Sequence, residues 1–468
     1  MSEEIAFAGA ARQAEMLRGK EVSSRELTEL YLSRIERFDP TLNSYRVVWG
    51  ERALEEADAA DKRLAAGEQA PLQGVPIAIK DVVDVAGDVT MYGTAAFVEP
   101  AAADSELVRR LRGAGAVLLG KTNLPELAIH GFTESQTFGV TRNPWDTERT
   151  PGGSSGGSGV AVAAGMAALA HASDGAGSIR YPAANCGLFG LKPQRDRVPV
   201  DAEHWFGMSV HGCLTRTVAD TALYLDAVTA GPSWSPNSPK APERPFSESA
   251  ATPPGKLRIA VTLKPPRAIA PPQLFDQSRR MVEQTAELLG SLGHQVEWRD
   301  PDWGGIGNQI AARYTGGIAE DVDGVPHRER LEPLTRGYRR IARVAAPGWA
   351  VRRSLRLEAA DRERVNAIFA DHDVLLTPMT AGPPVEVGHF HDRRALSCLL
   401  AQSRYYPYAV AWNHTGQPAA SVPAGLSSEG LPLAVQIVGR PADEATLLSL
   451  AAQLESERPW ALRKPELP

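Results

Sequence analysis

The sequence predicts an α/β fold, because short apolar runs typical of strands alternate with segments of helical periodicity. The runs Val75–Ile79 and Ala116–Leu119 indicate two strands in the first third of the chain. Beyond the middle, Leu257–Leu263 is typical of a strand, Met281–Leu292 of a helix and Val296–Trp298 of another strand. The alternation of the two periods favours helices layered on a sheet.

The N-terminal region is expected to be helical. Ser23 and Glu26 have the spacing of a capping box, which satisfies free amides at a helix start. The apolar residues that follow recur at helical intervals, and Pro40 is expected to end this helix. A second helix, rich in alanine and charge, is predicted over about Glu51–Ala66.

The C-terminal half continues the strand pattern at Val374–Pro378 and Leu433–Val438. Between the halves, residues 231–256 are rich in proline and serine, which predicts an irregular excursion. Because strands on both sides of it resemble parts of one sheet, we expect a single domain over residues 1–468. It would comprise an N-terminal helical region, a core, the excursion and a C-terminal part of the same sheet: residues 1–70, 71–230, 231–256 and 257–468.

Composition and charge are ordinary for a soluble globular protein, with 43% hydrophobic and 23% charged residues. A net charge of −6 gives no global attraction to nucleic acid or to an anionic membrane. No apolar stretch approaches the roughly 20 residues of a membrane-spanning helix. The first residues are acidic and lack a signal pattern, so we expect a cytoplasmic protein with neither nucleic acid nor membrane as partner. The basic segment Arg336–Arg364 is interpreted as a solvated helix face rather than an RNA-binding patch.

The three cysteines are far apart and odd in number, which predicts reduced, packed thiols. They are Cys186, Cys213 and Cys398. Cys186 as a nucleophile is the sharper hypothesis, but the local sequence offers it no histidine partner.

Gly115–Thr122 matches the sequence pattern of a phosphate-binding loop, but its residues do not suit the structure of that loop. That loop needs flexible residues between a strand and a helix, whereas Ala116–Leu119 are themselves strand material. Pro125 would fall in the first turns of the required helix. We therefore interpret Lys121 as a structural residue at a strand end.

A glycine- and serine-rich block supplies the candidate site. Pro151–Gly159 carries Ser154, and Ser178 follows in the run Ser173–Arg180. A serine hydroxyl needs a base to become a nucleophile, and Lys80 stands at the end of an apolar run where desolvation lowers the pKa of an amine. Ser178 is the candidate nucleophile. The alternative for both serine segments is a flexible linker.

The residues around Ser178 are small, so their backbone amides can approach a bound carbonyl closely. Amides of Gly175, Ala176, Gly177 and Ser178 would stabilise the oxyanion of a tetrahedral intermediate. No histidine stands in these motifs, which argues against a Ser-His-Asp triad. His130 and His171 are interpreted as packed or hydrogen-bonded.

In these motifs the chain resembles the amidase signature family, from about Ser23 to Trp460. The resemblance implies an α/β/α sandwich around a twisted mixed sheet, with Lys80, Ser154 and Ser178 as catalytic residues. In that family the serine at Ser154 has a cis peptide bond and relays protons. Asp174 and Arg180 would orient the loop through an ion pair, and Ser155 would support it.

The resemblance extends to scaffold residues, and it has one departure. Asn123, Glu126, Gln194 and the segments from Asn413 to Gly439 fit the family pattern as scaffold. Many members have Thr-Gly-Gly where this chain has Gly175-Ala176-Gly177. The variant is similar to the branch of broad amidases and 6-aminohexanoate cyclic-dimer hydrolases.

The resemblance implies an amidase that cleaves linear carboxylic amides to acid and amine through an acyl-enzyme. It needs no metal and no organic cofactor, and its partner is a small-molecule amide; a homodimer is left open. One alternative is the A-type subunit of a tRNA-dependent glutamine amidotransferase. Another is a non-catalytic binding protein on the same fold.

The variable region from about Ile306 to Tyr408 is expected to build part of the acyl pocket. Four aromatic residues indicate an aromatic lining, although core packing is an equal alternative: Tyr314, Tyr405, Tyr406 and Trp412.

Overall fold

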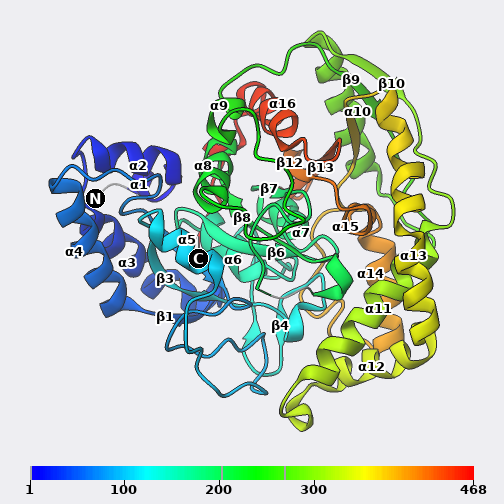
Figure 1. Cartoon of the computed structure of the whole chain (residues 1–468), viewed down its shortest axis with the longest axis horizontal. Coiled ribbons are helices and arrows are strands. Elements are labelled where there is room, and N and C mark those ends of the chain that lie inside the picture. Colours follow the sequence, from blue (N-terminus) through cyan, green and yellow to red (C-terminus); the bar gives the residue numbers. More distant parts are fainter. Residues whose placement is uncertain (1–2, 202–203, 268–269, 468) are drawn as a thin grey trace.

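The centre of the molecule is one mixed sheet of eleven strands (Figure 1). The computed structural model describes residues 3–201, 204–267 and 270–467. The strands lie in the order β1-β3-β2-β6-β8-β7-β12-β13-β11-β9-β10. In chain order their bounds are β1 Tyr45–Val48, β2 Pro76–Lys80, β3 Val117–Thr122, β6 Ala170–Asp174, β7 Phe189–Lys192, β8 Val210–Thr215, β9 Arg258–Val261, β10 Gln295–Trp298, β11 Val374–Pro378, β12 Ala419–Leu426 and β13 Pro432–Gly439. The α/β class and the mixed sheet are as expected.

Strands from both halves of the chain meet in the middle of this sheet, where β7 pairs with β12 in an antiparallel register. Parallel pairs join β2 to β3 and β6, and join β9 to β10 and β11. The proline-rich segment 231–256 is not wholly irregular, because it contains the short helix α9 (Phe246–Ala250). The carboxylate of Asp226 accepts the amides of Phe246 and Ser247 at its start. That cap comes from α8 (Val218–Thr229) and is not visible in local sequence.

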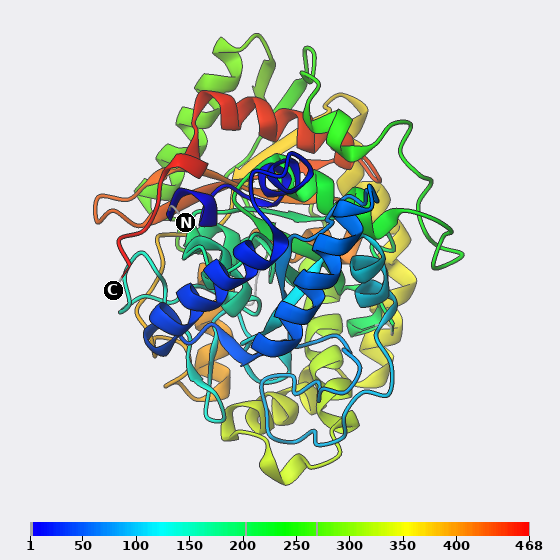
Figure 2. The ribbon, with the colours of Figure 1, turned by 90° about the vertical axis from the view of Figure 1, so that its left-hand side faces the viewer.

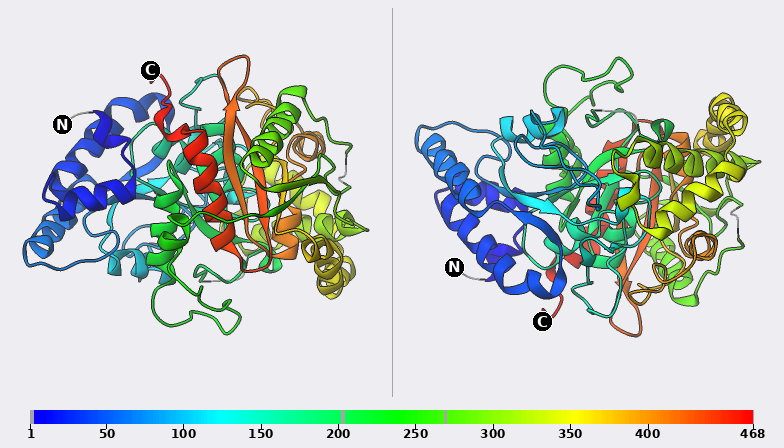
Figure 3. Two further views of the ribbon diagram at one scale, coloured as in Figure 1. Left: turned by 90° about the horizontal axis from the view of Figure 1, so that it is seen from above. Right: turned by 90° about the horizontal axis from the view of Figure 1, so that it is seen from below.

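Helices cover both faces of the sheet (Figure 3). Two neighbouring residues of β8 contact helices on the two faces, since successive residues of a strand point to opposite faces. A Cβ added at Gly212 would lie 2.8 Å from the Cδ1 of Ile179, at the start of α7 (Arg180–Cys186). The next residue, Cys213, instead lies with its Sγ 3.7 Å from the Oγ1 of Thr221 in α8.

The N-terminal helices lie together at one end of the sheet (Figure 2). Helix α3 begins with the predicted capping box of Ser23 and Glu26. It runs from Ser24 to Leu42 and so passes through Pro40, which contradicts the expected end. Pro40 falls in the last turn, where the helix loses only one amide donor. Asn43, with φ of 51°, ends it instead. The C-terminal end of the chain lies nearby, since the Nζ of Lys464 is 4.8 Å from the ring centroid of Phe7.

A group of helices from the variable region packs beside the C-terminal half of the sheet (Figure 1, right). These are α11 (Ile306–Gly324), α12 (Pro333–Ala345), α13 (Gly348–Asn366) and α14 (Ala395–Tyr405). Most arginines of the segment 336–364 are exposed or half-buried on α12 and α13, consistent with a solvated helix face. The remaining elements are α1 Glu3–Ala6, α2 Ala10–Arg18, α4 Gly50–Ala65, α5 Glu106–Gly113, β4 Glu134–Ser135, β5 Gly139–Val140, α6 Gly156–Ala163, α10 Asp276–Ser291, α15 Ala411–Thr415, α16 Glu444–Glu457 and short 3₁₀ turns.

Candidate active site

Lys80 is the buried centre of the candidate site. It ends β2 and is fully buried, and its Nζ donates to the Oγ of Ser154 at 2.7 Å and to the Oγ of Ser173 at 2.8 Å. Desolvation lowers the pKa of Lys80 from its usual 10.5 to about 7, with a smaller opposing effect of Asp174. A substantial fraction of the amine is therefore neutral near pH 7, as a general base requires.

The sheet brings Ser173 to Lys80. Strand β6 lies beside β2, with Ala78 paired to Ala170, so the ends of the two strands meet. Ser173 was not predicted as a site residue. Its position next to Asp174 was the one feature of the sequence that could have indicated it. Its contact with Lys80 depends on strand pairing that a single sequence does not reveal.

Ser154 stands in a glycine turn whose shape depends on the absence of side chains. The peptide bond between Gly153 and Ser154 is cis, as the resemblance implied. A Cβ at Gly153 would come within 2.4 Å of the carbonyl oxygen of Phe132, so only glycine fits there. Gly152 has φ of 80°, a conformation that favours glycine. The turn leads directly into α6, which is buried throughout, so the segment is not a flexible linker.

Ser178 lies in the loop between β6 and α7, with 9% of its surface exposed. The backbone amide of Ser155 donates to the carbonyl oxygen of Ser178 at 3.3 Å. The Ser155 hydroxyl donates to the carbonyl of Ser173 at 3.1 Å and accepts from the amide of Ser173 at 3.3 Å. Ser155 thus joins the two serine segments, which fits the supporting position expected of it.

The predicted oxyanion donors fall into two groups. The amide of Gly177 donates to the Oδ1 of Asp174 at 2.6 Å, so it is occupied within the loop and is not free for a ligand. The sequence could not show this, because the turn folds the loop back onto its own aspartate. Within the described part of the chain, the amides of Gly175, Ala176 and Ser178 have no internal acceptor. Three of the four candidate donors therefore remain.

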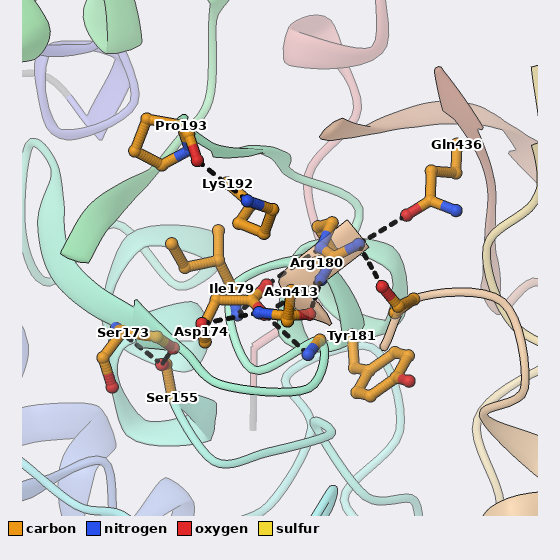
Figure 4. A network of polar contacts seen from close by, with 12 residues as sticks. Ser155, Ser173, Asp174, Ile179, Arg180, Tyr181, Lys192, Pro193, Asn413 and Gln436 are labelled. Atoms are coloured by element: carbon orange, nitrogen blue, oxygen red, sulfur yellow. Dashed lines mark hydrogen bonds and ion pairs between the residues drawn. The ribbon is translucent and has the colours of Figure 1, made fainter. Parts of the chain in front are cut away.

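Asp174 and Arg180 form a fully buried bidentate ion pair (Figure 4). The Nε and Nη2 of Arg180 each lie 2.9 Å from a carboxylate oxygen of Asp174. Burial raises the pKa of Asp174, but Arg180 and the amide of Asn413 lower it further, so that the net pKa is about 2. Asp174 therefore stays ionised, and it holds the turn by accepting the amides of Gly177 and Ile179.

The same pair ties the loop to the C-terminal half of the chain (Figure 4). Arg180 donates to the Oδ1 of Asn413 and to the Oε1 of Gln436, both at 2.7 Å. Asn413 donates in turn to the carboxylate and the carbonyl of Asp174 at 2.8 Å. The sequence predicted these segments only as turn and strand scaffold; Asn413 lies in α15 and Gln436 in β13.

Two cavities adjoin Ser178, and they differ in the share of polar groups in their lining. The apolar compartment, of about 120 Å³, is lined mainly by carbon atoms and by aromatic rings: Tyr181, Trp205, Tyr314 and Tyr406. The second cavity, of about 340 Å³, is named the polar compartment because it has the larger share of polar lining. Apolar side chains such as Val82, Phe97 and Leu127 line it as well, and its polar side chains are Ser154, Ser173, His204, His211, Glu320 and Asp321. Ala128, Ser178 and Trp205 border both.

Of the four aromatic residues expected at the pocket, two lie there. Tyr314 and Tyr406 line the apolar compartment. Tyr405 instead donates its hydroxyl to the carbonyl of Gly382 at 2.7 Å, and Trp412 is fully buried against Trp303. For these two, core packing is the correct interpretation.

The other candidate residues have structural partners. Lys121 lies within β3 and its Nζ is 3.2 Å from both Asp81 and Asp88. His171 is hydrogen-bonded to His211 at 3.1 Å, and His130 is stacked on Phe132.

The three cysteines are packed thiols, as expected. The three cysteines are buried and free, and burial raises the pKa of the Cys186 thiol. In residues 3–201, 204–267 and 270–467, no cluster of three or more histidine, cysteine or acidic side chains has the arrangement of a metal site. No helix in those ranges has the length and apolarity needed to span a bilayer.

Comparison with known proteins gives one consistent family. The Amidase family model matches residues 26–448. The chain is 50% identical over 470 residues to a protein of Mycobacterium tuberculosis named "Putative amidase AmiB2", with 99% of each chain covered. It is 33% identical to the 6-aminohexanoate-cyclic-dimer hydrolase of Pseudomonas sp. (strain NK87), covering 100% of this chain and 98% of that one.

Solved structures agree. A 6-aminohexanoate cyclic dimer hydrolase superposes with a TM-score of 0.87 at 30% identity, covering 98% of this chain and 99% of that one. A bacterial aryl acylamidase of the amidase signature family superposes with a TM-score of 0.85 at 26% identity, covering 97% and 96%.

Proposed function

The chain belongs to the amidase family, and on that premise we propose that it hydrolyses small carboxylic amides, linear amides among them, through an acyl-enzyme on Ser178. The observation that carries the proposal is the fully buried Lys80, with a pKa of about 7, hydrogen-bonded to Ser154 beside the cavity that Ser178 borders. A base at this pKa suits proton transfer near neutral pH.

In the proposed reaction the Oγ of Ser178 attacks the amide carbonyl. Its proton passes to the Oγ of Ser154, whose own proton passes to the Nζ of Lys80. The step between the two serine hydroxyls rests on the family resemblance. The amides of Gly175, Ala176 and Ser178 donate to the oxyanion of the tetrahedral intermediate.

Collapse of the intermediate breaks the C–N bond. Lys80 returns the proton through Ser154 to the leaving nitrogen, and the amine departs. Water then attacks the ester of Ser178, with its proton following the same path, and the acid is released. Asp174 and Arg180 are positioning residues that hold the loop throughout.

The positions of the relay residues orient the substrate. Ser154 and Ser173 border the polar compartment and are absent from the lining of the apolar one. Since Ser154 must protonate the leaving nitrogen, the amine lies on the polar side. The acyl group then lies in the apolar compartment, among the rings of Tyr181, Tyr314 and Tyr406.

The test is hydrolysis of a panel of aliphatic, aryl and lactam amides by the purified chain alone, without ATP or tRNA. We expect turnover by the wild type and a loss of several orders of magnitude in Ser178→Ala, with unchanged circular dichroism. Near-normal turnover in Ser178→Ala would remove Ser178 as nucleophile. Activity that requires a partner subunit, ATP and tRNA would support the amidotransferase alternative, and an inert wild type that no fluorophosphonate labels would support a binding protein.

A further inference from the structure

Trp205 borders both compartments beside Ser178. Of the three residues that border both cavities, it has the largest side chain, and only 6% of its surface is exposed. It begins the 3₁₀ turn Trp205–Gly207, which precedes β8. Nothing in the local sequence singles it out.

Helix α11 is shaped to receive this indole. A Cβ added at Gly317 would lie 2.7 Å from the Cγ of Trp205, so a side chain there would displace the ring. One helical turn further on, Asp321 accepts the indole Nε1–H at 2.6 Å. Residues four apart share one helix face, so Gly317 supplies the space and Asp321 the hydrogen bond for the same ring.

The six-membered part of the indole meets the loop of candidate oxyanion donors. A Cβ added at Gly175 would lie 3.0 Å from the Cε3 of Trp205. Tyr314 packs edge-on against the indole, with ring centroids 5.1 Å apart. The indole therefore contacts both α11 and the loop that precedes Ser178.

The backbone of Trp205 supports the same conclusion. Its φ is 54° and that of the next residue, Phe206, is 55°. A bulky residue is rare in this region of φ, and it persists there only where surrounding contacts hold it. The packing of the indole against Gly317 and Tyr314 and its hydrogen bond to Asp321 are such contacts.

We propose that Trp205 is the wall that separates the acyl side from the amine side and limits the length of the acyl group. This inference rests on the proposed function for the assignment of the two sides. The apolar compartment is the smaller one, so the preferred substrates carry compact apolar acyl groups. Long acyl chains are excluded, because the indole blocks their path into the larger compartment.

The test uses p-nitrophenyl esters with acyl chains from butanoyl to dodecanoyl, which report acylation and turnover whether or not amides are cleaved. The wild type is expected to prefer the short esters. In Trp205→Ala the ratio of kcat/KM for dodecanoyl over butanoyl should rise at least about ten-fold, because the two compartments merge. Titration with a fluorophosphonate gives the concentration of active sites, so partial unfolding does not alter the ratio.

Further variants separate the wall from general stability. Asp321→Leu removes the acceptor of the indole and should raise the same ratio, by less, whereas Asp321→Asn keeps an acceptor oxygen and should stay near wild type. Asp323→Leu is the matched control, since Asp323 lies on the same helix but pairs with Arg328 and Arg339 at the surface. If Trp205→Ala does not fold, Trp205→Leu makes the same comparison.

An unchanged chain-length ratio in folded Trp205→Ala or Trp205→Leu would overturn the proposal, as would an equal shift in Asp323→Leu. A wild type that cleaves the esters but no amide would contradict the proposed function alone. A wild type that reacts with no ester would contradict both.

Discussion

Two buried lysines on neighbouring strands of the sheet have different kinds of partner: one is surrounded by carboxylates and the other by hydroxyls. Lys80 ends β2 and Lys121 lies in β3, and both are fully buried. In the register of these parallel strands Lys80 is opposite Thr122, and Lys121 is opposite Ile79. Since alternate residues of a strand point to opposite faces, the two lysines lie on different faces of the sheet.

The partners differ in charge. Lys121 lies 3.2 Å from the carboxylates of Asp81 and Asp88, and Arg46 pairs with the same two groups. Lys80 meets two neutral hydroxyls, and the carboxylate that raises its pKa slightly, that of Asp174, is already paired with Arg180. A buried charge without a counter-ion is disfavoured, so the pKa of Lys80 is lowered towards the range that the proposed base needs, while Lys121 has the partners of a structural cation. Burial alone does not make a catalytic lysine.

The largest expected effect is the loss of activity in Lys80→Met. Methionine has a similar length but cannot accept a proton, so kcat/KM for an amide should fall by at least about 10³-fold. Removing a buried amine that has no counter-ion should leave the free energy of unfolding unchanged or raise it. Steady-state kinetics and urea unfolding measure the two effects.

The pH dependence of stability is the control for that variant. The folded pKa of Lys80 is about 7 and the unfolded value about 10.4, so between them the unfolded chain binds more protons. The contribution of Lys80 to stability therefore rises with pH across this window. The advantage of Lys80→Met over the wild type should be greatest below pH 7 and shrink towards pH 10; an advantage that grows with pH contradicts the assignment.

Lys121→Met should show the reverse pattern. It leaves Asp81 and Asp88 with Arg46 as their remaining cation, and breaking a buried pair costs about 3–5 kcal/mol. The urea midpoint should fall accordingly, while turnover per folded molecule stays within about three-fold of wild type. A stable Lys121→Met enzyme with no turnover would erase the contrast between the two lysines.

The sequence predicted the local half of this contrast. Lys80 follows an apolar strand, and the capping box of Ser23 and Glu26 is formed, because both signals lie within a few residues. The predicted end of α3 was wrong, because a proline in the last turn destabilises a helix only slightly. The partners of the lysines come from other strands and loops, so periodicity could not identify them.

Longer-range features were equally hidden. The contact of Ser173 with Lys80 depends on the pairing of β6 with β2. Trp205 is placed by a glycine and an aspartate more than 100 residues away on α11. Such contacts between distant segments are the part that required the structure.

Ser154→Ala tests the first of the two hydroxyls that distinguish Lys80 from Lys121. The proposed relay would serve both acylation and deacylation, and water can replace Ser154 in part, so the loss should be smaller than in Ser178→Ala. An alkoxide leaves with less help from a proton donor than an amine does. We expect a loss on an amide about ten-fold or more greater than on an ester of the same acid. Equal losses would indicate that Ser154 only shapes the turn.

Ser173→Ala should have the smallest effect, and it tests the second hydroxyl. In the wild type, kcat/KM should rise with pH through about 7 and then level off, because neutral Lys80 is the base. The Ser173 hydroxyl accepts a hydrogen bond from the Nζ of Lys80 and so stabilises the charged form. A hydrogen bond to a charged group contributes about 1.5–3 kcal/mol. The substitution removes that contribution from the charged form and a smaller one from the neutral amine, so only the difference shifts the pKa. The midpoint should therefore move to lower pH, by about half to one unit at 1.36 kcal/mol per unit, with a plateau reduced only several-fold.

Ser155→Ala is the matched control, since the Ser155 hydroxyl bonds the backbone of Ser173 and not Lys80. It should lower the plateau without moving the midpoint, and a midpoint that is unmoved or raised in Ser173→Ala would show that Ser173 does not set the charge state of Lys80.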